Sequence, residues 1–210
     1  MNPLLILSKQ YMKKILLVGI TGNFGAGKTT VAKILETEGC PVIYSDDLAK
    51  RLMRYDKRVQ EKLKKAFGNE VYQSDGDLNS KYLAEKVFST APDAEQNLIL
   101  LNSIVHPFVL SEAEKIINEL IKEGHNLIFF ESALIYEANI ENLFDYIILV
   151  VSDTDKITER LVSAGKFTPN EVVRRLEKQI PQEEKRKLAD FTIVNNGSIE
   201  ELQKNVQFIL

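Results

Sequence analysis

The sequence predicts an α/β fold in which a parallel five-stranded sheet carries helices on both faces. Short apolar segments recur along the chain, and segments with helical periodicity separate them. Strands that alternate with helices in this way pair in parallel through right-handed crossovers. A chain of 210 residues is long enough for one such domain with a full hydrophobic core. Ligands of these folds bind at the carboxyl ends of the strands, so the residues after each strand are the first candidates for function.

Each element of this fold has a local signal. The expected strands cover residues 15–18, 42–44, 127–130, 147–151 and 191–194, and the fourth is a continuous apolar run of the kind found in buried parallel strands. The expected helices cover residues 30–38, 94–122, 155–162, 170–179 and 198–209. Thr168 and Pro169 supply a cap and an initiating proline for the fourth of these helices. Pro107 is expected to break or kink the second helix, because proline removes a helical hydrogen bond.

We expect a single domain from residue 12 to residue 210. Within it, a charged helical region covers about residues 45–123, and the connection at about residues 160–170 is expected to form a short lid. Met12 stands just before the first strand, so residues 1–11 are interpreted as an N-terminal extension, with a true start at Met12 as the alternative. The extension lacks the basic start and the small-residue cleavage site of a signal peptide.

Composition argues against several classes of protein. No apolar stretch approaches the length of about 18 residues that a membrane span needs, so no membrane association is expected. A formal net charge of −3 argues against general affinity for nucleic acid. The single cysteine, Cys40, excludes an internal disulfide and fits the reducing cytoplasm, which is the expected location. We expect the protein to be a monomer.

A phosphate-binding loop follows the first expected strand. Every fixed position of the motif G-x-x-x-x-G-K-[ST] is filled, by Gly22, Gly27, Lys28 and Thr29, and the motif stands between a strand and a helix as it requires. Glycines let the backbone wrap so that its N–H groups face phosphate oxygens, and the following helix adds its positive end. The predicted ATP contacts in this loop are Gly22, Asn23, Phe24, Gly25, Ala26, Gly27, Lys28, Thr29 and Thr30.

Two side chains of the loop carry the expected chemistry. Lys28 is a positive charge that reaches the β- and γ-phosphates. The Thr29 hydroxyl is placed to ligate Mg²⁺, which bridges the same phosphate oxygens and neutralises charge as the phosphoryl group leaves. The chain is therefore expected to bind a nucleoside triphosphate together with Mg²⁺.

Two carboxylates follow other strands and are candidates for the site. Asp46 could be the base that takes the proton of an attacking hydroxyl, or it could cap the helix that begins there. Glu131 ends the third strand, where proteins with this loop often keep an acid near the metal, but it could also be a solvated loop carboxylate. The residues alone leave both alternatives open.

Basic residues surround the connection that is expected to form the lid. Small kinases close such a lid over ATP to stabilise the spreading negative charge and to exclude water. Basic residues on helices are also commonly just solvated, and a lone histidine such as His106 is more often packed or capping than catalytic. The lid candidates are Arg160, Lys166, Arg174 and Arg175.

Taken together, these features resemble the dephospho-coenzyme A kinases over nearly the whole of residues 14–207. Residues 42–50, VIYSDDLAK, are similar to the family's V-I-D-A-D-x-I-A-R and keep its second aspartate as Asp46. The family's F-G, D-G-x-L, V-F and L-x-x-I-x-H-P have counterparts at residues 67–68, 75–78, 87–88 and 101–107. Its R-I-x-x-Q and A-D-x-V-I-x-N-x-G have counterparts at residues 175–179 and 189–197.

The chain also departs from the family pattern. Tyr44 stands where the first aspartate of D-A-D is usual, and Lys50 stands where arginine is usual. Ala133 replaces the proline of the family's D-x-P-L-L-F-E in the segment ESALIYE, residues 131–137. Ala164 replaces the second arginine of the lid pattern R-L-x-x-R, so the missing charge comes from Lys166 or is absent.

The resemblance implies the last step of coenzyme A synthesis, in which the γ-phosphate of ATP is transferred to the ribose 3′-hydroxyl of dephospho-coenzyme A. It implies that Asp46 is the base and that Lys28 and Arg160 hold the transferring phosphoryl group. Thr29 and Glu131 are the expected Mg²⁺ ligands.

The resemblance also assigns residues to the two substrates. Asn196 and Gly197 would border the adenine of ATP. Lys50 and His106, with Asp46, would belong to the acceptor side, where basic residues of the helical region would face the acceptor's phosphates.

Two other functions stay open at this point. Another small-molecule or nucleotide kinase would share the loop, lid and base and differ only in its acceptor region. A nucleotide-operated switch or an ATPase belongs to a different class. A guanine-nucleotide switch would show N-K-x-D and D-x-x-G, and neither pattern occurs in the chain. A dehydrogenase has no support, because the G-x-G-x-x-G fingerprint is also absent.

Overall fold

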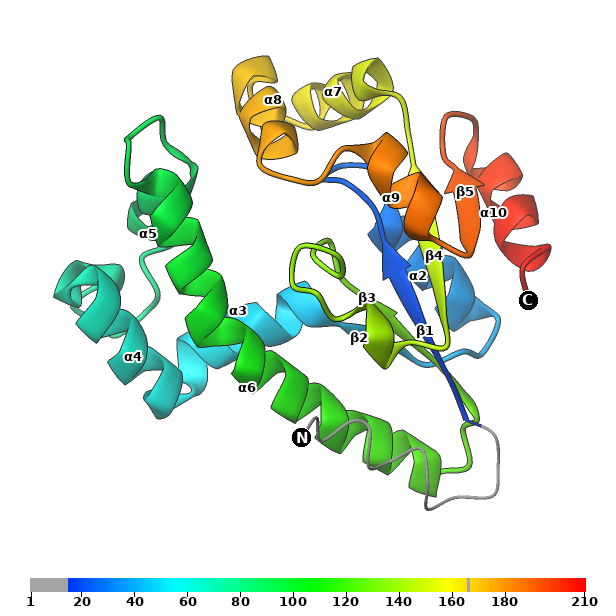
Figure 1. Cartoon of the computed structure of the whole chain (residues 1–210), viewed down its shortest axis with the longest axis horizontal. Helices are drawn as coiled ribbons and strands as arrows, with labels where there is room; N and C mark the ends of the chain where they lie inside the picture. Colours follow the sequence, from blue (N-terminus) through cyan, green and yellow to red (C-terminus); the bar gives the residue numbers. More distant parts are fainter. Residues whose placement is uncertain (1–14, 166) are drawn as a thin grey trace. The chain divides into compact units, whose positions relative to one another are not determined.

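The computed structural model describes residues 15–165 and 167–210 (Figure 1). The extension predicted at residues 1–11 and Lys166 of the predicted lid lie outside these ranges. The chain forms two compact units. The first contains the described residues up to Tyr44 together with residues 116–210, and the second contains Ser45–Lys115. The second unit falls within the helical region predicted at about residues 45–123.

In the described part of the first unit, five strands form one parallel sheet in the order β2-β3-β1-β4-β5 (Figure 1). They are β1 (Leu16–Thr21), β2 (Val42–Tyr44), β3 (Leu127–Glu131), β4 (Tyr146–Val151) and β5 (Phe191–Val194). The predicted fold class and its five strands are confirmed. β1 runs three residues further than predicted, because Gly19 and Ile20 pair with both neighbouring strands and Thr21 pairs with β4. The phosphate-binding loop therefore begins at the carboxyl end of the central strand.

Alternate residues of the strands point into two hydrophobic clusters, one on each face of the sheet. One cluster joins the sheet to α2 (Lys28–Thr37) and α10 (Ile199–Gln207). Its members include Val18, Ile20, Val31, Leu35, Ile148, Val150, Leu202 and Val206. The other cluster joins Ile147 to Ile135 and Tyr136 after β3, with Ile180 and Ala189 packed against it. Both faces of the sheet are thus covered, as predicted.

The other helices of the first unit follow β4. α7 (Thr154–Ser163) and α8 (Pro169–Glu177) lie close to their predicted positions, whereas the short α9 (Gln182–Leu188) was not predicted. α8 begins with a capping box between Thr168 and Glu171, and the predicted proline is its first residue. A turn of 3₁₀ helix, Glu141–Leu143, precedes β4.

The second unit is built from helices. They are α3 (Ser45–Tyr55), α4 (Lys57–Phe67), a 3₁₀ turn at Asn69–Val71, α5 (Ser80–Phe88) and the first part of α6 (Ala94–Lys122). Pro107 does not break α6, which continues through it. The proline costs about 3 kcal/mol, but Val105, Val109 and Ala113 recur every four residues and are all buried. Burial of such side chains, at about 1.5–3 kcal/mol for each valine, outweighs that cost.

None of the helices within residues 15–165 and 167–210 is both long enough and apolar enough to cross a membrane.

Candidate active site

The phosphate-binding loop leaves the end of β1 and runs directly into α2. Ala26 N donates to Asn23 O at 3.1 Å, which closes the loop into a turn. Gly27 is the N-cap of α2 and has a φ of 101°. Lys28 is buried and its Nζ donates to Asn23 O at 3.4 Å, whereas Thr29, in the same helical turn, is exposed. The first turn of a helix has N–H groups without helical partners, so the loop ends at a site suited to an anion.

Asn195 follows the edge strand β5, and its side chain holds the phosphate-binding loop in place. Its Nδ2 donates to Ala26 O at 2.8 Å, across 169 residues of sequence, and both residues are buried. A Cβ on Gly27 would lie 2.1 Å from Asn195 Nδ2. Glycine is therefore required at position 27 both by its left-handed backbone and by the close approach of Asn195.

Arg160 and Asn196, two predicted ATP contacts, lie together at the ends of β4 and β5. Arg160 Nη2 donates to Ser152 Oγ at 2.8 Å and also to Asn195 O. Asn196 Oδ1 accepts from Asp153 N at 2.9 Å and lies 3.0 Å from Ser152 Oγ. The structure thus brings these residues together at the carboxyl edge of the sheet, and their contact with ATP stays a prediction.

Glu131 and Gly197 occupy the same edge. Glu131 is only 3% exposed and pairs in register with Ile20 of β1, so the alternative of a solvated loop carboxylate is wrong. A Cβ on Gly197 would lie 1.7 Å from Glu201 Oε2, which accepts from Ser198 N in the capping box of α10. A side chain at position 197 would therefore displace the Glu201 carboxylate from the helix cap, apart from any role toward ATP.

A segment between α8 and α9 also contacts the loop. Phe24 N donates to Gln179 Oε1 at 2.7 Å, and Asn23 Nδ2 donates to Ile180 O at 3.4 Å. We call residues Gln179 and Ile180 the strap. The strap supplies hydrogen-bond acceptors to the tip of the loop from more than 150 residues away in sequence.

The side chain of Phe24 is held by the region that was predicted to form the lid. Its ring meets the ring of Phe167 edge to face, with centroids 5.1 Å apart. The guanidinium of Arg175 lies 5.2 Å from the Phe24 centroid and 4.9 Å from the Phe167 centroid. Burial lowers the pKa of Arg175, and the carboxylate of Glu171 opposes that shift. Arg175 is therefore packed against aromatic rings rather than simply solvated.

A pocket of about 520 Å³ lies beside Asn23 in the first unit. Its volume is within the range of small-molecule sites. Asn23 Oδ1 is buried and has no hydrogen-bond partner in the described structure, and the same holds for Thr21 Oγ1 at the end of β1, which does not line the pocket. The other lining residues come from the segment after β4, from α7 and α8, and from the start of α9: Ser152, Asp153, Thr154, Ile157, Val173, Leu176, Glu177, Pro181 and Gln182.

The predicted acceptor residues all belong to the second unit. Asp46 is exposed and lies inside the first turn of α3, which begins one residue earlier at Ser45, so it does not occupy the N-cap position that precedes the helix. Lys50, one turn further along α3, pairs with Asp47 at 2.9 Å. His106 of α6 is partly buried, and Asp46 is close enough for its charge to act on the imidazole. The structure thus brings Asp46 and His106 together within one unit.

His106 is expected to make stability fall as the pH decreases below about 6.5. Burial lowers the pKa of His106 from its ordinary value, and the carboxylate of Asp46 partly opposes this. The unfolded chain then binds a proton that the folded chain rejects between that lowered pKa and about 6.5, so acid favours unfolding. We expect His106→Gln to remove this part of the acid dependence in urea unfolding. A difference in free energy between the two proteins that stays constant from pH 8 to pH 5 would contradict this.

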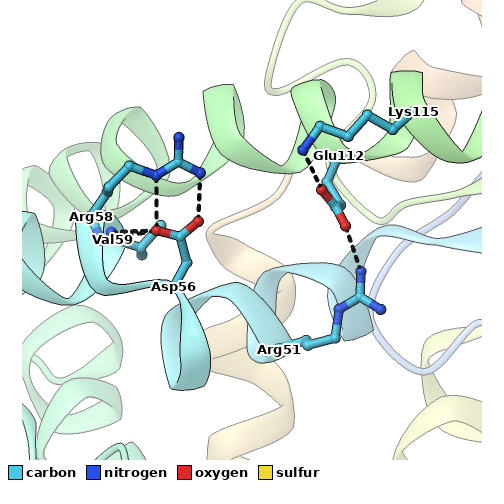
Figure 2. A network of polar contacts seen from close by, with 6 residues as sticks. All are labelled: Arg51, Asp56, Arg58, Val59, Glu112 and Lys115. Carbon is cyan, nitrogen blue, oxygen red and sulfur yellow. Dashed lines mark hydrogen bonds and ion pairs between the residues drawn. The ribbon is translucent and has the colours of Figure 1, made fainter.

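Several basic side chains of the second unit are already paired with carboxylates (Figure 2). Arg51 of α3 and Lys115 of α6 both bind Glu112, each at 3.0 Å. Arg58 binds Asp56, the N-cap of α4, at 2.7 Å, and this contact lowers the pKa of Asp56 to about 2. An acceptor phosphate would therefore have to share these cations with their carboxylates.

A pocket of about 340 Å³ adjoins this network. Arg58, Glu112 and Lys115 line it together with Leu52, Pro107, Phe108 and Ser111. The cationic groups of Arg58 and Lys62 lie over the Phe108 ring, 5.2 and 5.9 Å from its centroid. An aromatic face beside several cations suits a ligand that carries both a ring and phosphates.

Residues 16–201 match the family model described as dephospho-CoA kinase. The chain belongs to the dephospho-CoA kinase family. A dephospho-CoA kinase from Carboxydothermus hydrogenoformans is 34% identical over 194 residues, which cover 92% of each chain. One from Salinibacter ruber is 37% identical over 188 residues, which cover 89% of this chain and 92% of that relative. A solved structure from Thermus thermophilus is 32% identical and has a TM-score of 0.76, covering 94% of this chain and 97% of the other.

The match confirms the family resemblance that the motifs indicated, and the predicted roles of the site residues stay predictions. Three residues of the site had no predicted role. Asn195 and Gln179 stand in segments 189–197 and 175–179, which resemble family motifs, so a signal was present without an assignment. Ser152 directly follows β4, and its polar side chain at the carboxyl end of a strand was the available signal. The contacts of all three depend on distant parts of the chain.

Proposed function

We propose that this member of the dephospho-CoA kinase family transfers the γ-phosphoryl group of ATP to the ribose 3′-hydroxyl of dephospho-coenzyme A, giving coenzyme A and ADP. The observation that carries this proposal is the family match over residues 16–201. The phosphate-binding loop at the start of α2, with its buried Lys28, supports it independently.

The donor would bind to the first unit. Backbone N–H groups of the loop and of the first turn of α2 would face the phosphates, and Lys28 would place its charge on the β- and γ-phosphates. Arg160 would hold the transferring group with guanidinium donors other than Nη2, which already bonds to Ser152 and Asn195. Such fixed cations stabilise the charge that spreads over the γ-phosphoryl oxygens in the transition state.

The oxygen atoms that the protein offers near the phosphates suit a magnesium ion that binds together with the nucleotide. Mg²⁺ prefers oxygen ligands and is usually bound by one or two protein groups plus phosphate oxygens and water. Thr29 offers an exposed hydroxyl in the first turn of α2, and Glu131 offers a buried carboxylate at the end of β3. Within the described residues, no cluster of three or more histidine, cysteine or acidic side chains forms a cage of the kind other metals use. Bound Mg²⁺ would neutralise phosphate charge.

The acceptor would bind to the second unit. Asp46 would take the proton of the 3′-hydroxyl as that oxygen bonds to the γ-phosphorus, and the bond from the γ-phosphorus to ADP would break. Burial lowers the pKa of His106, which favours its neutral form near Asp46. Neutral His106 would then have one ring nitrogen that donates and one that accepts a hydrogen bond from the acceptor substrate. Lys50 would add positive charge toward the phosphates of that substrate.

The proposal is tested by offering purified protein Mg-ATP with and without dephospho-coenzyme A. We expect ADP release to depend on the acceptor and the product to carry a new phosphate on the ribose 3′-oxygen, as read by phosphorus NMR. AMP in place of dephospho-coenzyme A tests the alternative of a nucleotide kinase. ADP release at the same rate with and without acceptor would instead identify an ATPase.

A further inference from the structure

A buried ion pair joins α9 to the segment after β3, and neither of its residues is among those assigned to catalysis. Lys185 of α9 is fully buried, and its Nζ lies 2.7 Å from Oε1 of Glu137, which follows β3. Lys185 Nζ also donates to Ala133 O at 3.4 Å. A buried ion pair adds little net stability, because desolvation of the two charges offsets their attraction. Its presence here therefore calls for another explanation, such as the specification of a local geometry.

The geometry that this pair specifies is that of the strap. Glu137 Oε1 also accepts from Ile180 N at 3.1 Å. Ile180 O in turn accepts from Asn23 Nδ2, and the adjacent Gln179 accepts from Phe24 N. Hydrogen bonds to the two residues of the strap thus connect the buried charges with Asn23 and Phe24 of the loop.

The segment after the strap is held at a further point. Gln182 Oε1 accepts from Ser152 N at 3.1 Å, which ties the start of α9 to the end of β4. The strap is therefore held at Ile180 itself, by Glu137, and the chain is held again two residues further on, by the contact of Gln182 with Ser152.

We infer that Glu137 and Lys185 are positioning residues, which hold the strap against Asn23 and Phe24 and so fix the shape of the loop that receives the triphosphate. This inference rests on the proposed binding of ATP to the loop. The acceptor residues belong to the second unit, so the inference applies to the affinity for ATP and not to the affinity for dephospho-coenzyme A. A loop that is displaced by even a fraction of an ångström binds and orients its substrate less well.

Two double variants test the inference because they differ only in the side chain at position 137, where one offers an acceptor to Ile180 N and the other does not. Either single substitution would leave a buried charge without its partner, so both residues are neutralised together. Glu137→Gln with Lys185→Met keeps an oxygen for Ile180 N. Glu137 Oε2 has no partner among the described residues, so the glutamine NH₂ can take its place without displacing a donor. Glu137→Leu with Lys185→Met has the same charge and a similar volume but offers no acceptor.

The measurement is steady-state kinetics with each substrate varied, together with calorimetric titration of ATP. We expect the Gln/Met variant to keep the KM for ATP within about threefold of wild type and the Leu/Met variant to raise it about tenfold or more, with the KM for dephospho-coenzyme A unchanged in both. Equal KM values for ATP in the two variants would show that the ion pair serves folding only. Wild-type protein that fails to bind ATP would overturn the proposed function itself.

A third variant decides the matter if the double variants do not fold. Gln179→Met removes the acceptor of Phe24 N and leaves the buried ion pair intact. Its matched control is Gln207→Met, which removes an exposed contact to Glu38 at 2.9 Å. We expect the first substitution alone to raise the KM for ATP, by about tenfold. Equal values for the two variants would overturn the inference.

Discussion

Replacing Asp46 by asparagine is expected to lower kcat for dephospho-coenzyme A phosphorylation by about 10²- to 10⁴-fold, the usual contribution of a positioned base. Asparagine keeps the size and a carbonyl oxygen of the side chain but cannot accept the proton of the 3′-hydroxyl. Asp46 is exposed in the first turn of α3, close enough to His106 for its charge to act on the imidazole. ATP binding should be unchanged, because the residues that are proposed to bind ATP belong to the first unit.

The matched control for this substitution is the neighbouring carboxylate. Asp47→Asn removes the same charge from the same helical turn and breaks an exposed contact to Lys50, which contributes at most about 1 kcal/mol. Comparing the two variants separates catalysis by Asp46 from a general effect of negative charge near the helix N-terminus. Near-normal turnover of Asp46→Asn, with a loss of stability no larger than that of Asp47→Asn, would remove Asp46 from the mechanism.

The parts of the site that the sequence predicted are those in which function depends on adjacent residues. Gly27, Lys28 and Thr29 stand side by side in one motif, and their local geometry follows from a strand that leads into a helix. The same holds for the capping box at Thr168, which needs only a residue three positions further along the helix. Local rules of this kind can be read from one sequence without knowing the rest of the fold.

The contacts that shape the loop could not be predicted in this way. Asn195 reaches Ala26 across 169 residues, and Gln179 reaches Phe24 across 155. Which polar side chain meets which backbone group depends on the strand order and on the path of the connections, neither of which a local pattern contains. The continuity of α6 through Pro107 has the same cause, because burial of the neighbouring valines outweighs the local effect of proline.

The second large effect is expected from Gly22→Ala, which should lower the free energy of unfolding by about 3–5 kcal/mol through steric overlap and backbone strain together. Gly22 has a φ of +151°, which alanine rarely adopts, and an added Cβ would lie 2.2 Å from Val150 O. That oxygen belongs to the backbone of β4, where Val150 is fully buried, so it cannot move aside as a flexible side chain could. In a protein of this size such a loss lowers the Tm by roughly 6–20 °C.

Gly39→Ala is the control that separates the steric overlap from the backbone strain. Gly39 also has a positive φ, +84°, but an added Cβ there would meet no atom within 4 Å. This variant should lose only about 1–2 kcal/mol for the unfavourable backbone conformation. The smaller entropy of the unfolded chain with alanine is common to both variants and cancels in the comparison. The amount by which the loss for Gly22→Ala exceeds the loss for Gly39→Ala, read from thermal unfolding, therefore reports chiefly the overlap with β4. Equal losses would mean that the loop moves away from β4 to accommodate the methyl group, and in that case Gly22→Ala should lose affinity for ATP.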